Sequence, residues 1–272
     1  MLRGVVGELR VRSRHHAHAR GPAGRRHLLP GPRQARHCGA GPVGRGGRRP
    51  ARRRGGRGLT RGRDTETQKS PLHITLHAGE LAAKYLPANH LNALTFHIRQ
   101  AVEKGHAERI GHGIAIQTET DSAGLLALMA QRQVMVEVCL SSNVQILEVS
   151  GASHPLATYM ANNVPVALNT DDQGVSRSSL AGEYRRGALD QKLSYRQLKR
   201  MARTSLDHAF LPGATLWASL DTVAPVEACA PTATMGVGDP PSPACQAFLD
   251  GSERARMQWE LERRFRAFES QQ

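Results

Sequence analysis

Side chains able to bind a metal ion or to move a proton gather at four places between residues 72 and 172. In chain order these places read His77-Ala78-Gly79-Glu80, Arg109-Ile110-Gly111-His112-Gly113, Glu137-Val138-Cys139-Leu140-Ser141-Ser142-Asn143 and Asn169-Thr170-Asp171-Asp172. An imidazole can offer one ring nitrogen to a metal, and a carboxylate close to it can act as a general acid or base. The set therefore indicates metal-assisted acid–base chemistry.

Each group taken alone also has an ordinary structural interpretation. His77 and Glu80 could begin a surface helix, and His112 could be a buried histidine that hydrogen-bonds to a main-chain carbonyl. The neighbouring carboxylates of Asp171 and Asp172 are harder to explain in this way, because they repel one another unless a cation or a hydrogen-bond donor separates their tasks. Four such groups in succession favour a shared site.

The elements that must position these groups are short apolar runs, and a polar group follows the end of each run. The runs cover residues 72–76, 109–111, 134–138 and 164–168. Near-continuous apolar character is typical of buried parallel strands. The runs start about every 30 residues, which is the size of one βα unit, and α/β barrels place their chemistry just after the strands.

Helical periodicity fills the intervals between the runs and continues after the last one. The positions that carry it are Leu94, Ile98, Ala101 and Val102 before Gly105, then Leu125, Leu126, Leu128 and Met129 after the capping candidates Asp121 and Ser122, then a segment after His154-Pro155, then Leu180, Tyr184 and Ala188, and finally Leu198, Met201, Ala202 and Leu206. We expect the last two helices to close over the sheet.

The chain also contains segments of different composition at its two ends. Residues 1–65 hold 18 Arg, no Lys and only two acidic residues, so the net charge of +14 is concentrated there. We expect this Arg/Gly-rich segment to be disordered, or to come from a frameshifted start, since it has few residues that could form a core. Residues 222–246, rich in Ala, Pro, Gly and Thr, predict a mobile linker, and residues 252–268 an amphipathic helix. The region with the strand and helix patterns spans residues 70–220.

The four cysteines and the hydropathy profile bear on the compartment. Cys38, Cys139, Cys229 and Cys245 form no C-x-x-C pair and no even spacing. We therefore expect no disulfide framework and a reducing, cytoplasmic location. No run of about 18 apolar residues predicts a membrane span, and no apolar segment resembles a secretory signal.

The four blocks together resemble the adenosine deaminase family of the metal-dependent amidohydrolase superfamily. The similarity runs from about Leu72 to Trp217 and keeps the family's order and approximate spacing. It implies a (β/α)8 barrel, of which this chain would hold about four βα units plus C-terminal helices. It also implies one Zn²⁺ per site and a small purine nucleoside as substrate.

The resemblance implies a role for each residue near the metal. His77 and Asp171 would be metal ligands. Glu80 would carry a proton to the purine ring, and His112 would orient the metal-bound water and help to deprotonate it. A metal lowers the pKa of bound water toward about 7, so these roles are chemically consistent.

The same resemblance implies substrate contacts and shows departures from the family pattern. Asp172 would accept a hydrogen bond from a purine nitrogen, and the backbone N–H near Gly79 would touch the ring. Leu140 stands where the family commonly has Pro, and Gln173 stands where Pro is frequent. Neither departure removes a functional group.

A larger departure concerns the first half of the family's barrel. The resemblance implies two more metal ligands from an H-x-H pair on the first strand, and nothing suitable precedes Leu72. The nearest candidate, His15-His16-Ala17-His18, lacks flanking strand-forming residues. Since metal affinity depends on a complete ligand shell, we expect little or no deaminase activity from the chain as written.

Three interpretations remain open at this stage. The first is an adenosine deaminase sequence that is truncated or frameshifted at its start. The second is a related deaminase acting on adenine, a modified adenosine or AMP, although no glycine-rich phosphate-binding loop is present. The third is a nucleic-acid-binding protein that acts through residues 1–65, which is disfavoured because this segment lacks aromatic residues for base stacking. The sequence does not indicate an oligomeric state.

Overall fold

The computed structural model describes residues 72–230 and 240–272. The interpretation of residues 1–65 as a disordered or frameshifted segment, and the nucleic-acid-binding alternative that depends on it, lie outside these ranges. The described elements run in the order β1 (Thr75–Ala78), η1 (Ala83–Tyr85), η2 (Ala88–Thr95), α2 (His97–Glu103), β2 (Arg109–His112), η3 (Ile114–Thr118), α3 (Ser122–Gln131), β3 (Met135–Val138), α4 (Leu140–Leu147), η4 (Gly151–Ser153), α5 (Leu156–Ala161), β4 (Val166–Leu168), α6 (Gln173–Ser176), α7 (Leu180–Leu189), α8 (Tyr195–Asp207), β5 (Trp217–Ser219), β6 (Ala224–Pro225), η5 (Glu227–Cys229), α9 (Pro243–Asp250) and α10 (Glu253–Glu269).

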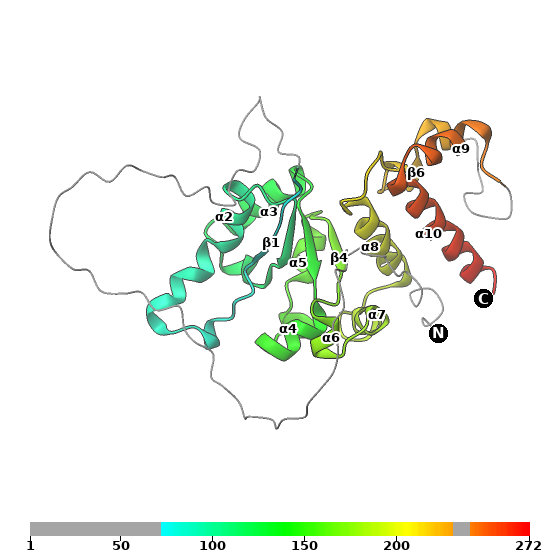
Figure 1. The fold of residues 1–272 in the computed structure, drawn as a ribbon. Coiled ribbons are helices and arrows are strands. Elements are labelled where there is room, and N and C mark those ends of the chain that lie inside the picture. The colour runs from blue at the N-terminus through cyan, green and yellow to red at the C-terminus, as the bar shows by residue number, and fades with distance from the viewer. Residues whose placement is uncertain (1–71, 231–239) are drawn as a thin grey trace, which may run out of the picture. The chain divides into compact units, whose positions relative to one another are not determined.

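Four parallel strands form the sheet that carries the site (Figure 1). Their spatial order is β1-β2-β3-β4, the same as their order in the chain, and helices occupy each connection between strands. Four consecutive βα units in this order are the arrangement found in half of a (β/α)8 barrel. The expected α/β class and the four-unit partial barrel are thus confirmed.

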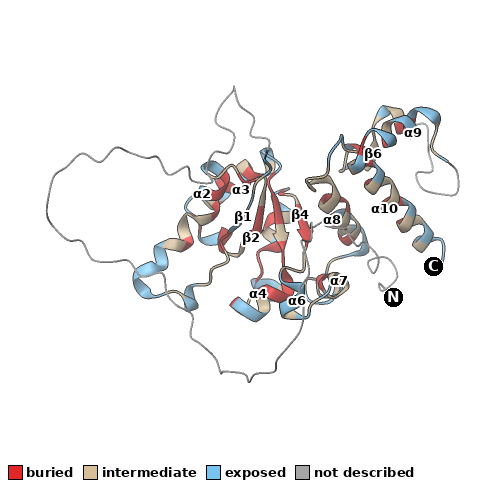
Figure 2. Cartoon of the chain, in the orientation of Figure 1, coloured by how far each residue is buried: buried red, intermediate tan, exposed pale blue. Residues whose placement is uncertain are grey.

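The two faces of the sheet differ in polarity because successive side chains point to opposite sides. Ile110 and Val136 are fully buried. Much of the sheet is coloured as buried in Figure 2. On the opposite face, Arg109 Nε lies 2.7 Å from Glu137 Oε1, and the hydroxyl of Thr75 donates a 3.2 Å hydrogen bond to the same oxygen. Thr75, Arg109 and Glu137 therefore share one polar face of the sheet.

Strand and helix boundaries follow the sequence patterns with small shifts. The run at 72–76 predicts a strand, but β1 begins only at Thr75, where pairing with Arg109 starts. The Asp121 side chain caps α3 by accepting from Gly124 N at 3.1 Å. Ser194 and Gln197 form a capping box at the start of α8, which carries the expected apolar positions Leu198 and Met201.

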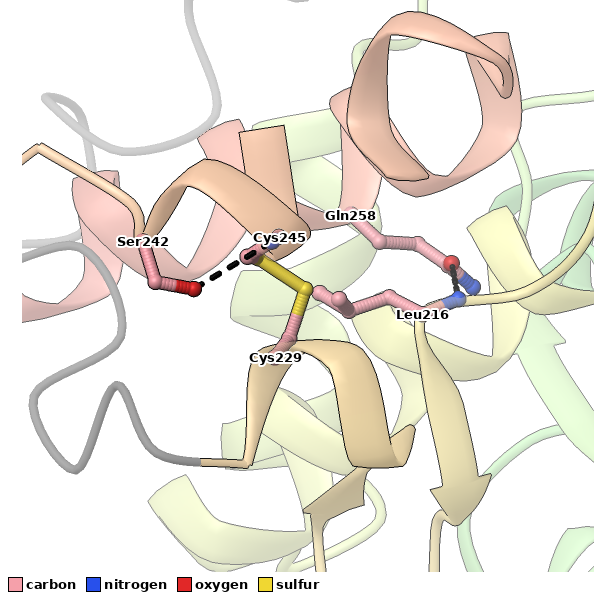
Figure 3. Close-up of a disulfide and its surroundings, with 5 residues drawn as sticks. All are labelled: Leu216, Cys229, Ser242, Cys245 and Gln258. Carbon is pink, nitrogen blue, oxygen red and sulfur yellow. Dashed lines mark hydrogen bonds between the residues drawn. A yellow bond between two sulfur atoms is a disulfide. The ribbon is translucent and has the colours of Figure 1, made fainter. Parts of the chain in front are cut away.

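The C-terminal part forms a second core that differs from the expected linker. Within 222–246 the structure has β6, η5 and the start of α9, while residues 231–239 lie outside its description. A disulfide joins Cys229 and Cys245, both fully buried beside Leu216 (Figure 3). The expectation of no disulfide is wrong, because folding brings together two cysteines 16 residues apart whose spacing carries no recognisable signature.

A buried ion pair connects this second core to α8. Arg203 donates two hydrogen bonds, of 2.7 and 2.8 Å, to the carboxylate of Glu262 on α10. Both side chains are nearly inaccessible to solvent. The expected amphipathic C-terminal helix is present as α10, and its inward face carries Leu261 and Phe265. No helix in the two described ranges is long and apolar enough to cross a membrane.

Candidate active site

The carboxyl ends of the four strands meet around a cavity of about 230 Å³. Its lining residues come from all four strands or from the positions just after them: His77, Gly111, His112, Glu137, Cys139, Asn169, Thr170 and Asp171. Three of the residues singled out from the sequence are therefore together at one cavity. Parallel strands place their carboxyl ends at one edge, which explains the convergence.

His77, Glu80 and His112 form a compact group of possible metal ligands. One ligand atom from each residue lies within 4.8 Å of the others. The rings of His77 and His112 are tilted at 53° with their centroids 4.9 Å apart, and Glu80 Oε1 lies 3.5 Å from His112 Nδ1. Gly111 pairs with His77 in the sheet, and a Cβ at this glycine would already touch the His77 ring.

The position of His112 depends on the backbone around it. His112 has a φ of +70° and Gly113 a φ of +62°, so the chain turns sharply at the end of β2. A side chain at Gly113 would collide with the Tyr159 hydroxyl, which donates a 2.6 Å hydrogen bond to the Gly113 carbonyl. A left-handed φ is costly for a residue with a side chain, and such residues often occur at functional sites.

Gly79 separates His77 from Glu80 and must be a glycine for two reasons. Its φ is +67°, and an added Cβ would lie 2.7 Å from the Ile98 side chain. Its carbonyl accepts a 2.9 Å hydrogen bond from Ala115 N, which fastens this turn to η3. The suggested contact between the Gly79 backbone and a substrate stays a prediction.

The two acidic residues after β4 occupy different environments. Asp171 lines the cavity, accepts a 2.7 Å hydrogen bond from the Ser142 hydroxyl, and lies 4.0 Å from His112 Nε2. Asp172 is exposed and precedes α6, outside the cavity lining. The structure thus brings Asp171 to His77 and His112 but leaves Asp172 at the surface.

Residues 140–143, at the end of the third polar group, form the first turn of α4. No sequence pattern described above predicts this helix. From this turn Ser142 reaches Asp171, and the Asn143 amide lies 3.0 Å from His112 Nδ1. The fully buried Glu183 on α7 accepts a 3.1 Å hydrogen bond from Ser141 N. Sequence reasoning assigned no role to Asn143 or Glu183. The place of Asn143 in a polar block was the one available signal.

Burial controls the electrostatics of the titratable groups near the cavity. It lowers the pKa of His112, and the carboxylates of Glu80 and Asp171 partly oppose this effect. Burial also raises the pKa of the Cys139 thiol, reinforced by the nearby acidic residues, so this cysteine stays protonated. The Cys139 thiol is therefore a poor nucleophile and a poor metal ligand as it stands.

The donor set is chemically suitable for a divalent metal. Imidazole nitrogens and carboxylate oxygens are ordinary ligands of zinc. Glu80 Oε1 is buried and has no hydrogen-bond partner in the described ranges, and a buried polar atom of this kind is costly unless a ligand compensates it. This orphaned oxygen, 3.5 Å from His112 Nδ1, is the observation that supports a bound group here.

Comparison with known proteins agrees with this geometry. The family model described as "Adenosine deaminase" matches residues 64–225, which is more than half of the chain. An adenosine deaminase of Escherichia coli O1:K1 / APEC is 36% identical over 140 residues, which are 51% of this chain and 38% of that protein. The chain thus spans well under half the length of the curated relatives that it matches.

Solved structures with local similarity are also deaminases by their descriptions. An adenine deaminase from Arthrobacter aurescens is 27% identical with a TM-score of 0.42, covering 52% of this chain and 39% of that one. An N6-methyl-AMP deaminase from Arabidopsis thaliana is 29% identical with a TM-score of 0.40, covering 52% and 37%. On the match of the family model to residues 64–225, the chain belongs to the adenosine deaminase family.

Proposed function

We propose that this chain carries the part of an adenosine deaminase site that holds the acid–base groups, and that the reaction is hydrolysis of adenosine to inosine and ammonia. The observation that carries the proposal is the grouping of His77, Glu80 and His112 within 4.8 Å, with Asp171 on the same cavity. Membership of the adenosine deaminase family supports the reaction class.

Each residue has a separate task in this proposal. His77 and Asp171 would hold a divalent metal, most simply zinc, from opposite strands of the sheet. When bound, such an ion lowers the pKa of a coordinated water toward neutrality. The Glu80 carboxyl carries a proton to the purine ring nitrogen next to the carbon that is attacked, and His112 orients the attacking water.

Two further contacts belong to the proposed substrate site. Asp172 would accept a hydrogen bond from a purine nitrogen, which requires its exposed side chain to turn toward the ligand. The Gly79 backbone would contact the ring from the turn that leads to Glu80. The alternative substrates are adenine, a modified adenosine and AMP, and comparing turnover of adenosine, adenine and AMP separates three of these four candidates.

The full chain tests the proposal when metal binding and turnover are measured separately. Zinc is added to metal-free protein, bound zinc is measured by equilibrium dialysis, and inosine, hypoxanthine or IMP is then measured with adenosine, adenine or AMP as substrate. We expect one zinc site that His77→Ala weakens, and any turnover of adenosine should be lost in Glu80→Ala.

The possible results have distinct meanings. Zinc binding unaffected by both His77→Ala and Asp171→Ala would contradict the proposed metal site. Turnover of adenosine that persists in Glu80→Ala would contradict the role of Glu80. Preference for adenine or AMP over adenosine would replace the proposed substrate while leaving the reaction class intact.

A further inference from the structure

Three buried polar side chains form a hydrogen-bonded series that leads to His112. His154 Nε2 lies 3.2 Å from Asn143 Oδ1, and Asn143 Nδ2 lies 3.0 Å from His112 Nδ1. His154, Asn143 and His112 are at most 3% exposed. Buried polar groups are almost always paired, so the direction of each hydrogen bond in the series can be derived.

The series starts at a backbone N–H group, which can only donate a hydrogen bond. The backbone N–H of Leu156 donates a 3.1 Å hydrogen bond to His154 Nδ1. A backbone N–H can only donate, so His154 Nδ1 must be an acceptor and the ring proton must lie on Nε2. Burial lowers the pKa of His154 to about 4, which agrees with a neutral ring at neutral pH.

The orientation of Asn143 follows from that proton. The Nε2–H of His154 needs an acceptor, so the amide oxygen of Asn143 must face His154. A flipped amide would set its NH₂ group against the Nε2–H, with two donors in contact. The NH₂ group of Asn143 therefore faces His112 and donates to it.

The orientation of the Asn143 amide in turn fixes the proton on His112. Because Asn143 donates to Nδ1, that nitrogen is unprotonated, and neutral His112 carries its proton on Nε2. Glu80 Oε1 also lies near Nδ1, but its distance of 3.5 Å is longer than an ordinary hydrogen bond, so the closer Asn143 amide determines the form. Nε2 is the nitrogen 4.0 Å from Asp171 Oδ2, on the side of the cavity. A doubly protonated ring would oppose a second donor to the Asn143 amide.

We propose that Asn143 and His154 are positioning residues that hold His112 in its Nε2–H form, with the N–H aimed at Asp171 and the cavity. The significance for catalysis rests on the proposed function, whereas the position of the proton does not. In this form His112 orients a water oxygen by donating to it. The ring has no free lone pair for a metal, so His112 is not a third ligand beside His77.

Nuclear magnetic resonance of the ring nitrogens tests the proposal on the full, metal-free chain. Protonated and unprotonated nitrogens of a neutral imidazole differ strongly in ¹⁵N shift, so histidine-labelled protein reports the proton's position in each ring. Signals of His112 and His154 are assigned by their loss in His112→Gln and His154→Gln. We expect the Nε2–H form for both rings, and the Nδ1–H form at His112 in the wild type would overturn the proposal.

Two variants separate positioning from mere structural support. Asn143→Asp keeps the size of the side chain but offers acceptors to both rings, so His112 should switch to the Nδ1–H form. His154→Gln keeps a donor at the place of Nε2, so His112 should keep its form. An unchanged His112 tautomer in folded Asn143→Asp would overturn the role of Asn143. A changed His112 tautomer in folded His154→Gln would mean that a donor at the place of Nε2 does not orient Asn143, which would overturn the role given to His154. Should either variant fail to fold, the wild-type spectrum still decides the tautomer.

Discussion

The Ser142 hydroxyl donates a 2.7 Å hydrogen bond to Asp171 Oδ2, which ties the first turn of α4 to the acidic side chain that follows β4. Asp171 has a left-handed φ of +54°, which is costly for a residue with a side chain. A contact that fixes the Asp171 side chain helps to stabilise this backbone conformation. The hydrogen bond leaves the other carboxylate oxygen of Asp171 for a metal in the proposed site.

Replacing Ser142 by Ala should weaken zinc binding without unfolding the protein. Loss of a hydrogen bond that orients a ligand typically lowers metal affinity about 10–100-fold. Equilibrium dialysis of zinc measures the change. Ser141→Ala is the matched control, because the hydrogen bond of Ser141 to Glu183 uses its backbone N–H. Equal zinc affinity in the two variants would argue against a role of Ser142 in holding Asp171.

His154 should make the fold sensitive to moderate acid. Burial lowers its pKa from 6.5 to about 4 in the folded state. The unfolded chain therefore binds a proton at this histidine at a higher pH than the folded chain does. The contribution of neutral His154 to stability is fully present above pH 6.5 and is lost as the pH falls toward 4. A difference of this size corresponds to about 3 kcal/mol.

Urea unfolding at several pH values measures this loss. His154→Gln has no titrating ring at this position, so the difference in unfolding free energy between wild type and variant should change between pH 6.5 and pH 4. Other titrating groups contribute to both proteins and cancel in the difference. A constant difference across that range would show that His154 does not titrate as argued.

The disulfide should stabilise the C-terminal core. Cys229 and Cys245 close a loop with a sequence separation of 16, for which the chain-entropy estimate is about 3 kcal/mol. The double variant Cys229→Ser, Cys245→Ser should therefore lose about 3 kcal/mol of unfolding free energy, measured by urea unfolding. Cys139→Ser is the control for the remaining described cysteine, whose thiol is free. Wild-type protein that alkylates at Cys229 without reduction would contradict the pairing.

The buried pair between Arg203 and Glu262 should show strong coupling. Removing one partner leaves an uncompensated buried charge, so Arg203→Met should lose about 3–5 kcal/mol of unfolding free energy. Replacing both, with Arg203→Met and Glu262→Leu, should restore much of that loss. A double-mutant cycle by urea unfolding measures the coupling, and additive losses would contradict it.

The sequence predicts much of the sheet and of the site because both rest on local patterns. Four apolar runs mark the strands, and the polar residues that follow them, His77, His112 and Asp171, lie together in the structure. Convergence follows from the parallel strand order alone. Asp172 is exposed beside α6, and this position could not be predicted from the role expected of Asp171.

The contacts that hold the site depend on tertiary structure and carry no local signal. Asn143 meets His154 across 11 residues, and Glu183 reaches Ser141 across 42. The same holds for the disulfide, whose two cysteines are brought together by η5 and α9. The Ala, Pro and Gly content of residues 222–246 predicts a linker, because composition carries no information about the buried partners Leu216 and Leu249.

The contacts made by the first turn of α4 also limit which insertions or deletions of residues the segment before Ser142 can accept. Successive residues of an α-helix are rotated by about 100° around its axis. An added or deleted residue directly before Ser142 would therefore swing Ser142 away from Asp171 and Asn143 away from His112 at once. A loop can absorb such a change in length, whereas here a single frame-preserving codon insertion would disconnect the acidic residue and the imidazole together.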